Sequence, residues 1–328
     1  MLWILVMAIS AEATRKPKVY QVNLSNPPLT RWTHIQAEYA SEIKVFAENY
    51  AAQVSKDELE GIVVLLENGY LTKEFSEELH GLANTVNITY NQAVFLNFMY
   101  EWNAYCTSIV VRLTNGTVIH GRNLDYMSST FLMDTTVQIQ VYKGTKYLYT
   151  SVGFAWYLGV GTGIGPGYSV SQNQRSQGGR DETFEALAKG YQGDLWVLRQ
   201  SFINFQRYDE AMWYLSNIKV AASTYYIVAG LEQGSILVRN RDDIAGSMML
   251  NDENWYLVQT NSDPWLKDPD GRRLTAMKKL DSIGQKNMNV DQLLGVLQTF
   301  PVINPTTVFT TIMVPESGYL NTTIYTSD

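Results

Sequence analysis

The sequence predicts an α+β protein in which a helical N-terminal segment precedes an antiparallel sheet with helices packed on it. Through residues 33–102, apolar residues recur with a period near 3.6, which is typical of amphipathic helices. At Cys106 the pattern changes to β-branched and apolar runs, which favour strands. Beyond this point strand-like and helix-like segments gather in separate runs, and this order is typical of the α+β class.

The helical segment carries its own start and stop signals. Ser55 with Glu58 forms a capping-box pattern, and Thr89 with Gln92 forms a second one. Asn68-Gly69 provides a helix stop between them. No strand pattern interrupts residues 33–102, so we expect helices throughout this segment.

The strands begin with a hairpin around the Asn-Gly dipeptide at residues 115–116, and Asn-Gly is the strongest short hairpin signal. A second hairpin is predicted over residues 135–154, turning at Lys143-Gly144. The remaining predictions are helices at 183–192, 194–205 and 209–217, strands at 222–231, 234–241 and 255–261, helices near 272–283 and 290–299, and a last strand near 307–314.

A two-residue turn at Asn115-Gly116 would set the register of the first hairpin. Cys106 would then lie directly opposite Asp125, with the two Cβ atoms about 5 Å apart. Arg122 would point to the other side of the sheet. To join Cys106 it would need either a bulge, for example at Asn123, or an escape at the end of the strand.

Composition excludes several classes of function. The chain has 328 residues, of which 45% are hydrophobic and 17% charged, so a substantial core is expected. The net charge is −7 and no basic stripe is present, so we expect no nucleic-acid partner. No run approaches the ~20 apolar residues of a membrane span. The single cysteine excludes a disulfide within the chain.

The N-terminus resembles a short signal peptide, predicted to span residues 1–13. The apolar run MLWILVMAIS is followed by small residues, although no Lys or Arg precedes it. A buried N-terminal strand is the alternative. Four glycosylation sequons agree with a secreted protein, and they begin at Asn23, Asn87, Asn115 and Asn321.

The residues alone leave the role of Cys106 open. A lone cysteine in a core strand often serves as a small hydrophobic residue, whereas a nucleophilic one needs an electropositive neighbour or a base. His34 and His80 lie in the helical segment, and in the predicted register His120 lies about 16 Å along the strand. No Cys–His pair is therefore expected.

The sequence does not match the spacing of a phosphate-binding loop or of a zinc site. The glycine-rich residues 159–167 match neither spacing of a phosphate-binding loop, and we interpret them as a flexible loop. No Cys/His cluster has zinc-ligand spacing. We therefore expect neither a metal nor a cofactor.

The stretch CTSIVVRLTNGTVIHGRNLDY, residues 106–126, resembles the start of the catalytic subunit in the family of acid ceramidase and N-acylethanolamine-hydrolysing acid amidase. Further similar motifs follow in the same order, namely YYIVAG, VRNRD, VQTNSDPW, DGRR and VFTTIM. RWTHI and LENGYL in the helical segment resemble the family more loosely. The ordered set covers most of the chain and is more specific than any single motif.

The resemblance implies the αββα sandwich of the N-terminal nucleophile hydrolases. It also implies a precursor that cuts itself before the cysteine, here between Tyr105 and Cys106. Residues 14–105 would then form a helical N-terminal (alpha) subunit, and residues 106–328 the catalytic (beta) subunit. The family's catalytic residues match Cys106, Arg122, Asp125, Asn261 and Arg272.

The implied roles follow from chemistry. Cys106 attacks an amide carbonyl, and its new α-amino group, with an ordinary pKa of about 7.7, replaces the missing histidine as base. Arg122 favours the thiolate, Asp125 orients the amine, and Asn261 donates to the oxyanion. Arg272 supports the site or faces the substrate.

The implied enzyme is a secreted or lysosomal amidase of lipid amides. It would cut ceramide to sphingosine and fatty acid, or an N-acylethanolamine to ethanolamine and fatty acid. The motifs HGRNLDY and VRNRDD favour the amidase branch, and VQTN favours the ceramidase. The alternatives are a non-catalytic lipid-binding protein of the same fold, or a hydrolase of a non-lipid amide such as a bile salt.

The resemblance also implies partners, and the chain departs from the family's pattern at several positions. The helical segment would meet a membrane or micelle surface, and the two fragments would form a non-covalent heterodimer, since no cysteine is left for the bridge of acid ceramidase. Gln174 stands near the place of a family acidic residue that assists self-cleavage. Ser262 and Pro264 stand where relatives have Tyr and a basic residue.

Overall fold

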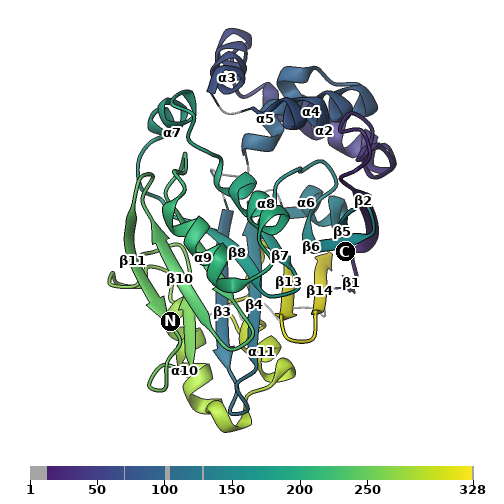
Figure 1. Cartoon of the computed structure of the whole chain (residues 1–328). Helices are drawn as coiled ribbons and strands as arrows, with labels where there is room; N and C mark the ends of the chain where they lie inside the picture. Colours follow the sequence, from purple (N-terminus) through teal and green to yellow (C-terminus); the bar gives the residue numbers. More distant parts are fainter. Residues whose placement is uncertain (1–12, 70, 100–103, 128, 327–328) are drawn as a thin grey trace, which may run out of the picture.

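The computed structural model describes residues 13–69, 71–99, 104–127 and 129–326. Within them, two sheets pack face to face and carry helices on their outer faces, as Figure 1 shows. The α+β class and the αββα layering are thereby confirmed. Most of the predicted signal peptide, residues 1–12, lies outside the described residues, and Ala13 begins the first strand.

The six-stranded sheet holds the hairpin of Cys106 at its centre. Its strand order is β1-β14-β13-β4-β3-β12. The strands are β1 (Ala13–Arg15), β14 (Tyr319–Thr326), β13 (Thr307–Val314), β4 (Val118–Tyr126), β3 (Ala104–Arg112) and β12 (Tyr256–Gln259).

The eight-stranded sheet faces it, in the order β11-β10-β9-β8-β7-β6-β5-β2. The strands are β11 (Ile244–Met249), β10 (Gly234–Arg239), β9 (Thr224–Ala229), β8 (Ser169–Gln174), β7 (Thr162–Ile164), β6 (Lys146–Phe154), β5 (Thr136–Lys143) and β2 (Lys18–Asn23). The glycine-rich residues 159–167, expected to be a loop, include β7. The predicted second hairpin is present, but its turn lies one residue later because Lys143 pairs with Lys146.

Helices cover both outer faces. α10 (Arg272–Ile283) and α11 (Val290–Leu297) pack on the six-stranded sheet, and α8 (Asp194–Asn204) and α9 (Tyr208–Asn217) pack on the eight-stranded one. The other helices are α1 (Thr33–Gln36), α2 (Ala40–Ala51), α3 (Lys56–Gly69), α4 (Lys73–Val86), α5 (Tyr90–Met99), α6 (Ser129–Thr135), α7 (Arg180–Ala188) and the 3-10 turns Ala37–Tyr39 and Gln285–Asn287.

Alternation along β3 divides the core. Val110 points between the sheets, where it packs in one cluster with Tyr225 and Ile227 of β9. Ile109 and Val111 point to the opposite face and pack against α10 and α11. A side chain's parity along β3 or β4 thus decides whether it lies between the sheets or under the helices.

The N-terminal segment is not only helical. β1 pairs antiparallel with β14 at the edge of one sheet, and β2 pairs parallel with β5 at the edge of the other. The expected helices α2 to α5 gather at one end of the molecule (Figure 1). Both capping boxes supply hydrogen bonds, since Ser55 caps Glu58 N and Thr89 and Gln92 cap each other's backbone. The description as a helical subunit is therefore incomplete, because this segment completes both sheets.

The register predicted for the first hairpin is wrong by one residue. Leu113 and Thr117 close a three-residue loop in which Gly116 has φ +94°. Cys106 therefore lies opposite Leu124, and Tyr105 lies opposite Asp125. This pattern matches a three-residue hairpin loop with glycine in the left-handed region, which Asn-Gly allows as readily as a two-residue turn.

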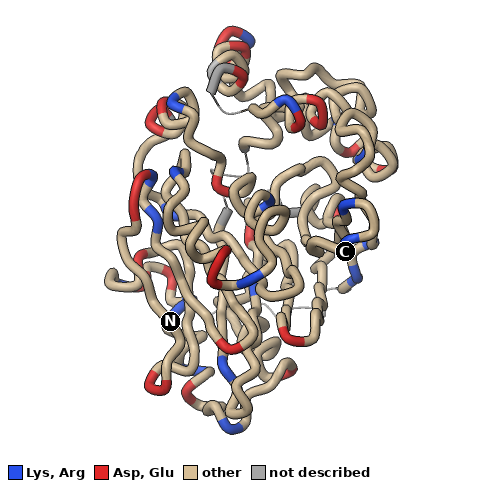
Figure 2. The backbone as a smooth tube through the Cα atoms, viewed as in Figure 1, with Lys and Arg blue, Asp and Glu red and all other residues tan. Residues whose placement is uncertain are grey.

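The structure also shows how charged residues are distributed and how long and apolar the helices are. Figure 2 shows Lys and Arg in short separate segments among acidic ones, without one continuous basic band in that view. None of the helices in the described ranges has the length and apolar content that a membrane crossing requires.

Candidate active site

Cys106 lies on β3 with its thiol between the two sheets and its side chain fully buried. Arg122, on the neighbouring strand, shares this face because the observed register places it opposite Ser108. Its Nη2 donates to Cys106 Sγ at 3.0 Å. No bulge near Asn123 is needed, because β3 and β4 pair without a shift and the register shift near this place lies on β13.

Arg122 is held from the opposite sheet. Its Nη1 donates to the carbonyl oxygen of Gly161 and, at 2.5 Å, to Thr162 Oγ1 at the start of β7. The glycine-rich stretch thus brings its backbone to the guanidinium rather than to a phosphate. The arginine is fully buried and its fork is fixed beside the sulfur.

Burial and Arg122 act on the thiol in opposite directions. Burial raises the pKa of Cys106 above its ordinary value, while the charge of Arg122 lowers it, and the net direction is upward. The thiol of the uncut chain is therefore protonated at neutral pH. It needs a proton acceptor before it can act as a nucleophile.

Asp125 occupies the other face of the sheet. Thr307 Oγ1 donates to Asp125 Oδ1 at 2.7 Å, and Asn304 Nδ2 donates to Asp125 Oδ2 at 2.8 Å. Burial raises the pKa of Asp125 to about 6, although the hydrogen bond from Thr307 and the charge of Arg272 oppose this shift. The carboxyl group therefore titrates within the mildly acidic range.

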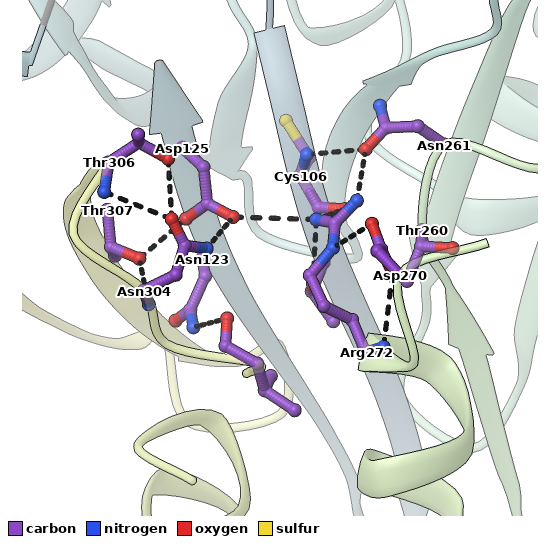
Figure 3. A network of polar contacts seen from close by, with 12 residues as sticks. Cys106, Asn123, Asp125, Thr260, Asn261, Asp270, Arg272, Asn304, Thr306 and Thr307 are labelled. Atoms are coloured by element: carbon purple, nitrogen blue, oxygen red, sulfur yellow. Dashed lines mark hydrogen bonds and ion pairs between the residues drawn. The ribbon is translucent and has the colours of Figure 1, made fainter. Parts of the chain in front are cut away.

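Arg272, the first residue of α10, links Asp125 to the backbone of Cys106 and to Asn261, as Figure 3 shows. Its Nη1 donates to Cys106 O at 2.9 Å and lies 3.4 Å from Asp125 Oδ2. Its Nη2 donates to Asn261 Oδ1 at 3.0 Å. Asp270 anchors the arginine, because its Oδ2 accepts from Arg272 Nε at 2.7 Å. Asp125 thus reaches Cys106 through Arg272.

Asn261 follows β12 and faces the backbone nitrogen of the cysteine (Figure 3). Cys106 N donates to Asn261 Oδ1 at 2.8 Å, and Asn261 Nδ2 donates to the carbonyl oxygen of Gln174 at 2.9 Å. Asn261 Oδ1 accepts from Cys106 N and from Arg272 Nη2, while Nδ2 donates to the carbonyl oxygen of Gln174. These partners fix which end of the amide is the oxygen. In the uncut chain, Asn261 therefore accepts from the nitrogen that cleavage would turn into an α-amino group. Its donation to an oxyanion stays a prediction.

His120 shares the inner face with Cys106 but serves the sheet packing. Its two ring nitrogens lie 3.0 and 2.9 Å from the hydroxyls of Ser169 and Ser171 on β8. Burial lowers the pKa of His120 to about 3, so the imidazole stays neutral. The expectation that no Cys–His pair forms agrees with these contacts.

The structure brings the five predicted site residues into one contact network, although the predicted register was wrong. Sequence reasoning missed three residues that hold Asp125 and Arg272, namely Asn304, Thr307 and Asp270. Asp270 could have been found, since a DG pair directly before a helix is a local signal. Asn304 and Thr307 lie 179 and 182 residues from Asp125, so only the fold brings them there.

Tyr105, the residue before the predicted nucleophile, has an exposed fraction of 52%, while Cys106 has none. The predicted cleavage bond therefore joins a solvent-facing residue to a buried one. Among the sequon asparagines, Asn87 and Asn115 are exposed, whereas Asn23 and Asn321 are half-buried and hydrogen-bonded through their side chains.

A metal centre is not found in the described ranges, where no three His, Cys, Asp or Glu side chains are arranged to hold an ion. The chemistry of the network is that of a buried thiol, a fixed guanidinium beside its sulfur, and polar groups around the nitrogen of the same residue. Such a set can attack a carbonyl and stabilise the charges that develop.

Comparisons with known proteins point to one family. A family model described as the beta subunit of N-acylethanolamine-hydrolyzing acid amidase matches residues 15–62, within the segment before Cys106. The chain is 34% identical over 331 residues to N-acylethanolamine-hydrolyzing acid amidase of Caenorhabditis elegans, with 95% of this chain and 93% of that protein covered. It is 29% identical over 336 residues to acid ceramidase of Balaenoptera acutorostrata scammoni, with 92% and 85% covered.

A solved structure is similar as well. The Caenorhabditis elegans N-acylethanolamine-hydrolyzing acid amidase ortholog superposes with a TM-score of 0.62 at 34% sequence identity. The match covers 68% of this chain and 100% of the solved one.

Proposed function

Because the chain belongs to the family that contains N-acylethanolamine-hydrolyzing acid amidase and acid ceramidase, we propose that it is a self-cleaving cysteine amidohydrolase of lipid amides. The observation that carries this proposal is the pair of contacts at Cys106, with Arg122 at its sulfur and Asn261 at its nitrogen. An N-acylethanolamine is the preferred substrate and ceramide the second, because the amidase relative described above is the more similar of the two.

Maturation would use the thiol on its own chain. Cys106 Sγ attacks the carbonyl carbon of Tyr105, and the peptide bond breaks as a thioester forms and the nitrogen of Cys106 takes up a proton. Water then hydrolyses the thioester, which frees the thiol and leaves Tyr105 with a carboxylate. The nitrogen that Asn261 now holds becomes an α-amino group next to the sulfur.

Substrate hydrolysis would repeat this chemistry on a bound lipid amide. The α-amino group takes the thiol proton and passes it to the leaving amine as Sγ forms an acyl thioester. A water molecule, deprotonated by the same amine, releases the fatty acid and restores the thiol. Arg122 stabilises the thiolate, and Arg272 with Asp125 keeps the backbone of Cys106 in place.

The proposed product is a heterodimer of residues 14–105 and 106–328, held together without a disulfide. The match to the solved relative supports it. The whole of that solved chain matches 68% of this chain, and residues 106–328 make up a share of the same size (223 of 328). The beta-subunit description of the matching family model also supports a two-part organisation, although the match itself falls before Cys106.

A substrate assay separates this proposal from its alternatives. Purified chain, incubated at pH 4.5 to 7.5, would receive palmitoylethanolamide, ceramide and a conjugated bile salt in parallel, with the Cys106→Ala variant as the control. We expect ethanolamine and fatty acid from the first substrate, and none from the variant. Hydrolysis of the bile salt alone would favour the non-lipid amidase, and binding of a lipid amide without product or self-cleavage would favour a carrier.

Secretion or delivery to the lysosome, and docking on a membrane or micelle, are further proposals. Exposed sequon asparagines support the first. Val45 of α2 and Val64 of α3, with exposed fractions of 59% and 49%, support the second, because they offer apolar contacts to lipid. Glycosidase-sensitive mass on the cellular protein, and co-sedimentation with anionic and neutral vesicles, test the two separately.

A further inference from the structure

The last two residues of β8 and Arg175, which follows them, contact the segment 259–263, here called the Asn261 loop. Asn173 Nδ2 donates to the carbonyl oxygens of Gln259 and Thr260 at 2.9 and 3.2 Å. The carbonyl oxygen of the next residue, Gln174, accepts from Asn261. The following side chain, Arg175, binds Asp263. Because β8 and β12 belong to different sheets, these contacts fix the Asn261 loop of one sheet against a strand of the other.

Asp263 is the charged anchor of this loop. Arg175 donates to both of its carboxylate oxygens, from Nε at 2.7 Å and from Nη2 at 2.9 Å. Tyr225 of β9 donates its hydroxyl to Oδ1 at 2.7 Å. Burial raises the pKa of Asp263, but the hydrogen bonds of Arg175 and Tyr225 outweigh it, and the pKa lies below the ordinary value. Asp263 is therefore ionised and held in one orientation, as bidentate arginine pairs require.

The Asn261 loop is also tied to the helix that carries Arg272. Arg273 Nη1 donates to the carbonyl oxygens of Ser262 and Asp263, both at 3.1 Å. Asn261, two residues before Asp263, thus sits between anchors on β8, β9 and α10. Its Oδ1 meets Cys106 N at 2.8 Å, a distance that a shift of about 1 Å would take beyond hydrogen-bond range.

We propose that Asp263, bound by Arg175 and Tyr225, is a positioning residue that fixes Asn261 against the nitrogen of Cys106. It touches neither the thiol nor this nitrogen, so it acts through the Asn261 loop. The inference rests on the proposed function, because the nitrogen of Cys106 matters only if that residue is the nucleophile. A purely structural ion pair is the competing explanation, since removing one partner of a buried pair destabilises a fold whatever the pair's role in catalysis.

Tyr225→Phe is the sharpest test, because it removes one hydrogen bond to Asp263 and keeps the ring and the charges. Tyr226→Phe is its matched control. Tyr226 is the next residue of β9, is equally buried, and donates its hydroxyl to the carbonyl oxygen of Asp194 on the opposite side of the strand. Both variants lose a single tyrosine hydroxyl from the same strand, but only one of them touches Asp263.

We expect Tyr225→Phe to lower kcat about 10-fold with KM within twofold of the wild type, and to slow self-cleavage by a similar factor. Tyr226→Phe keeps the wild-type kcat. Arg175→Lys retains the charge but loses the fork, and we expect a loss of about 100-fold in kcat. Thermal unfolding, measured alongside in the Cys106→Ala background, separates a loss of stability from a loss of rate.

Equal kcat in Tyr225→Phe and Tyr226→Phe would overturn the positioning role and leave the proposed function standing. A fall in kcat of Tyr225→Phe that appears only at temperatures above the onset of its unfolding would do the same. If Arg175→Lys does not fold, the tyrosine pair still decides. A wild-type chain that neither cuts itself nor releases a fatty acid would instead overturn the proposed function, and the positioning role would fall with it.

Discussion

Arg122 Nη2 donates to Cys106 Sγ across neighbouring strands, and the two side chains meet between the sheets because Cys106 pairs with Leu124 and Ser108 with Arg122. The guanidinium opposes the effect of burial, which raises the pKa of the thiol. The sulfur is therefore buried and protonated in the uncut chain, with a cation in place to stabilise the thiolate once a base removes the proton.

Replacing Arg122 with Gln should raise the pKa of Cys106 further, because it removes the positive charge that now favours the thiolate. The pH at which iodoacetamide alkylates Cys106 at half its maximal rate then moves upward. Arg112→Gln is the matched control, because Arg112 lies on the same strand as Cys106 but pairs with the exposed Asp252. An unchanged alkylation profile in Arg122→Gln would show that the guanidinium does not act on the thiol.

Replacing Cys106 itself separates packing from chemistry. Cys106→Ala should abolish self-cleavage and hydrolysis while the chain stays folded, because it removes only one buried sulfur atom. Cys106→Ser should retain slow self-cleavage, since a hydroxyl can also attack the preceding carbonyl. Gel analysis over days and product detection measure both. Normal turnover by Cys106→Ala would mean that the nucleophile lies elsewhere.

Asp125 makes stability depend on pH. Its pKa is raised to about 6 in the folded chain from an ordinary value of 3.8, so the folded state binds this proton more tightly than the unfolded state does. The stabilisation is present below about pH 4 and is lost as the pH rises through 6. Between pH 4 and 7, the rise of this pKa from 3.8 to about 6 corresponds to a loss of about 3 kcal/mol in the free energy of unfolding.

Asp125→Asn should remove this dependence. Urea unfolding of the Cys106→Ala chain, with and without the second substitution, measures the difference at each pH and cancels the other titrating groups. The stability advantage of the chain that keeps Asp125 over the chain with the Asp125→Asn substitution should shrink by a few kcal/mol from pH 4 to pH 7. Parallel pH profiles for the two chains would contradict the raised pKa.

Glu78 and Arg199 join the two expected fragments. Glu78 of α4 accepts from both terminal nitrogens of Arg199 on α8 at 2.6 and 2.7 Å, and its side chain has no exposed surface. Arg31 and Trp32 donate to the same carboxylate from within the N-terminal segment. A buried pair of this kind is strongly destabilised when one partner loses its charge.

After cleavage, the fragments should separate on a denaturing gel without reductant and co-elute under native conditions. Glu78→Gln should weaken their association by about 3 kcal/mol and lower the urea concentration at which they separate. Glu77→Gln is the matched control, because Glu77 is the adjacent residue and pairs with the exposed Lys73 of its own helix instead of with Arg199. Dissociation of the wild-type fragments at native pH would show that the helical segment is released.

For the central hairpin of β3 and β4, the sequence predicted both strands correctly but placed their pairing one residue out of register. Asn115-Gly116 identified the hairpin, but the dipeptide fits a two-residue and a three-residue loop alike. One residue of difference moved every side chain of β4 to the other face relative to β3. This is why Asp125, expected beside Cys106, lies on the outer face, and Arg122, expected outside, lies beside the thiol.

Edge strands and supporting residues could not be predicted from local patterns. β1 has three residues and β2 has six, and each is stabilised by a partner strand more than 100 residues away. Asn304 and Thr307 bind Asp125 only because β13 pairs with β4. The five site residues came from the resemblance rather than from spacing, because their common neighbourhood depends on the packing of α10 and β12 on β3.

N-terminal sequencing of the larger fragment after acid incubation tests the central claim most directly. The contacts at the sulfur and nitrogen of Cys106 predict a fragment that begins with Cys106 and ends at Asp328, 223 of the 328 residues. Its intact mass should equal that of the uncut chain plus one water minus the smaller fragment. A fragment that begins at any other residue, with hydrolase activity retained, would contradict the account.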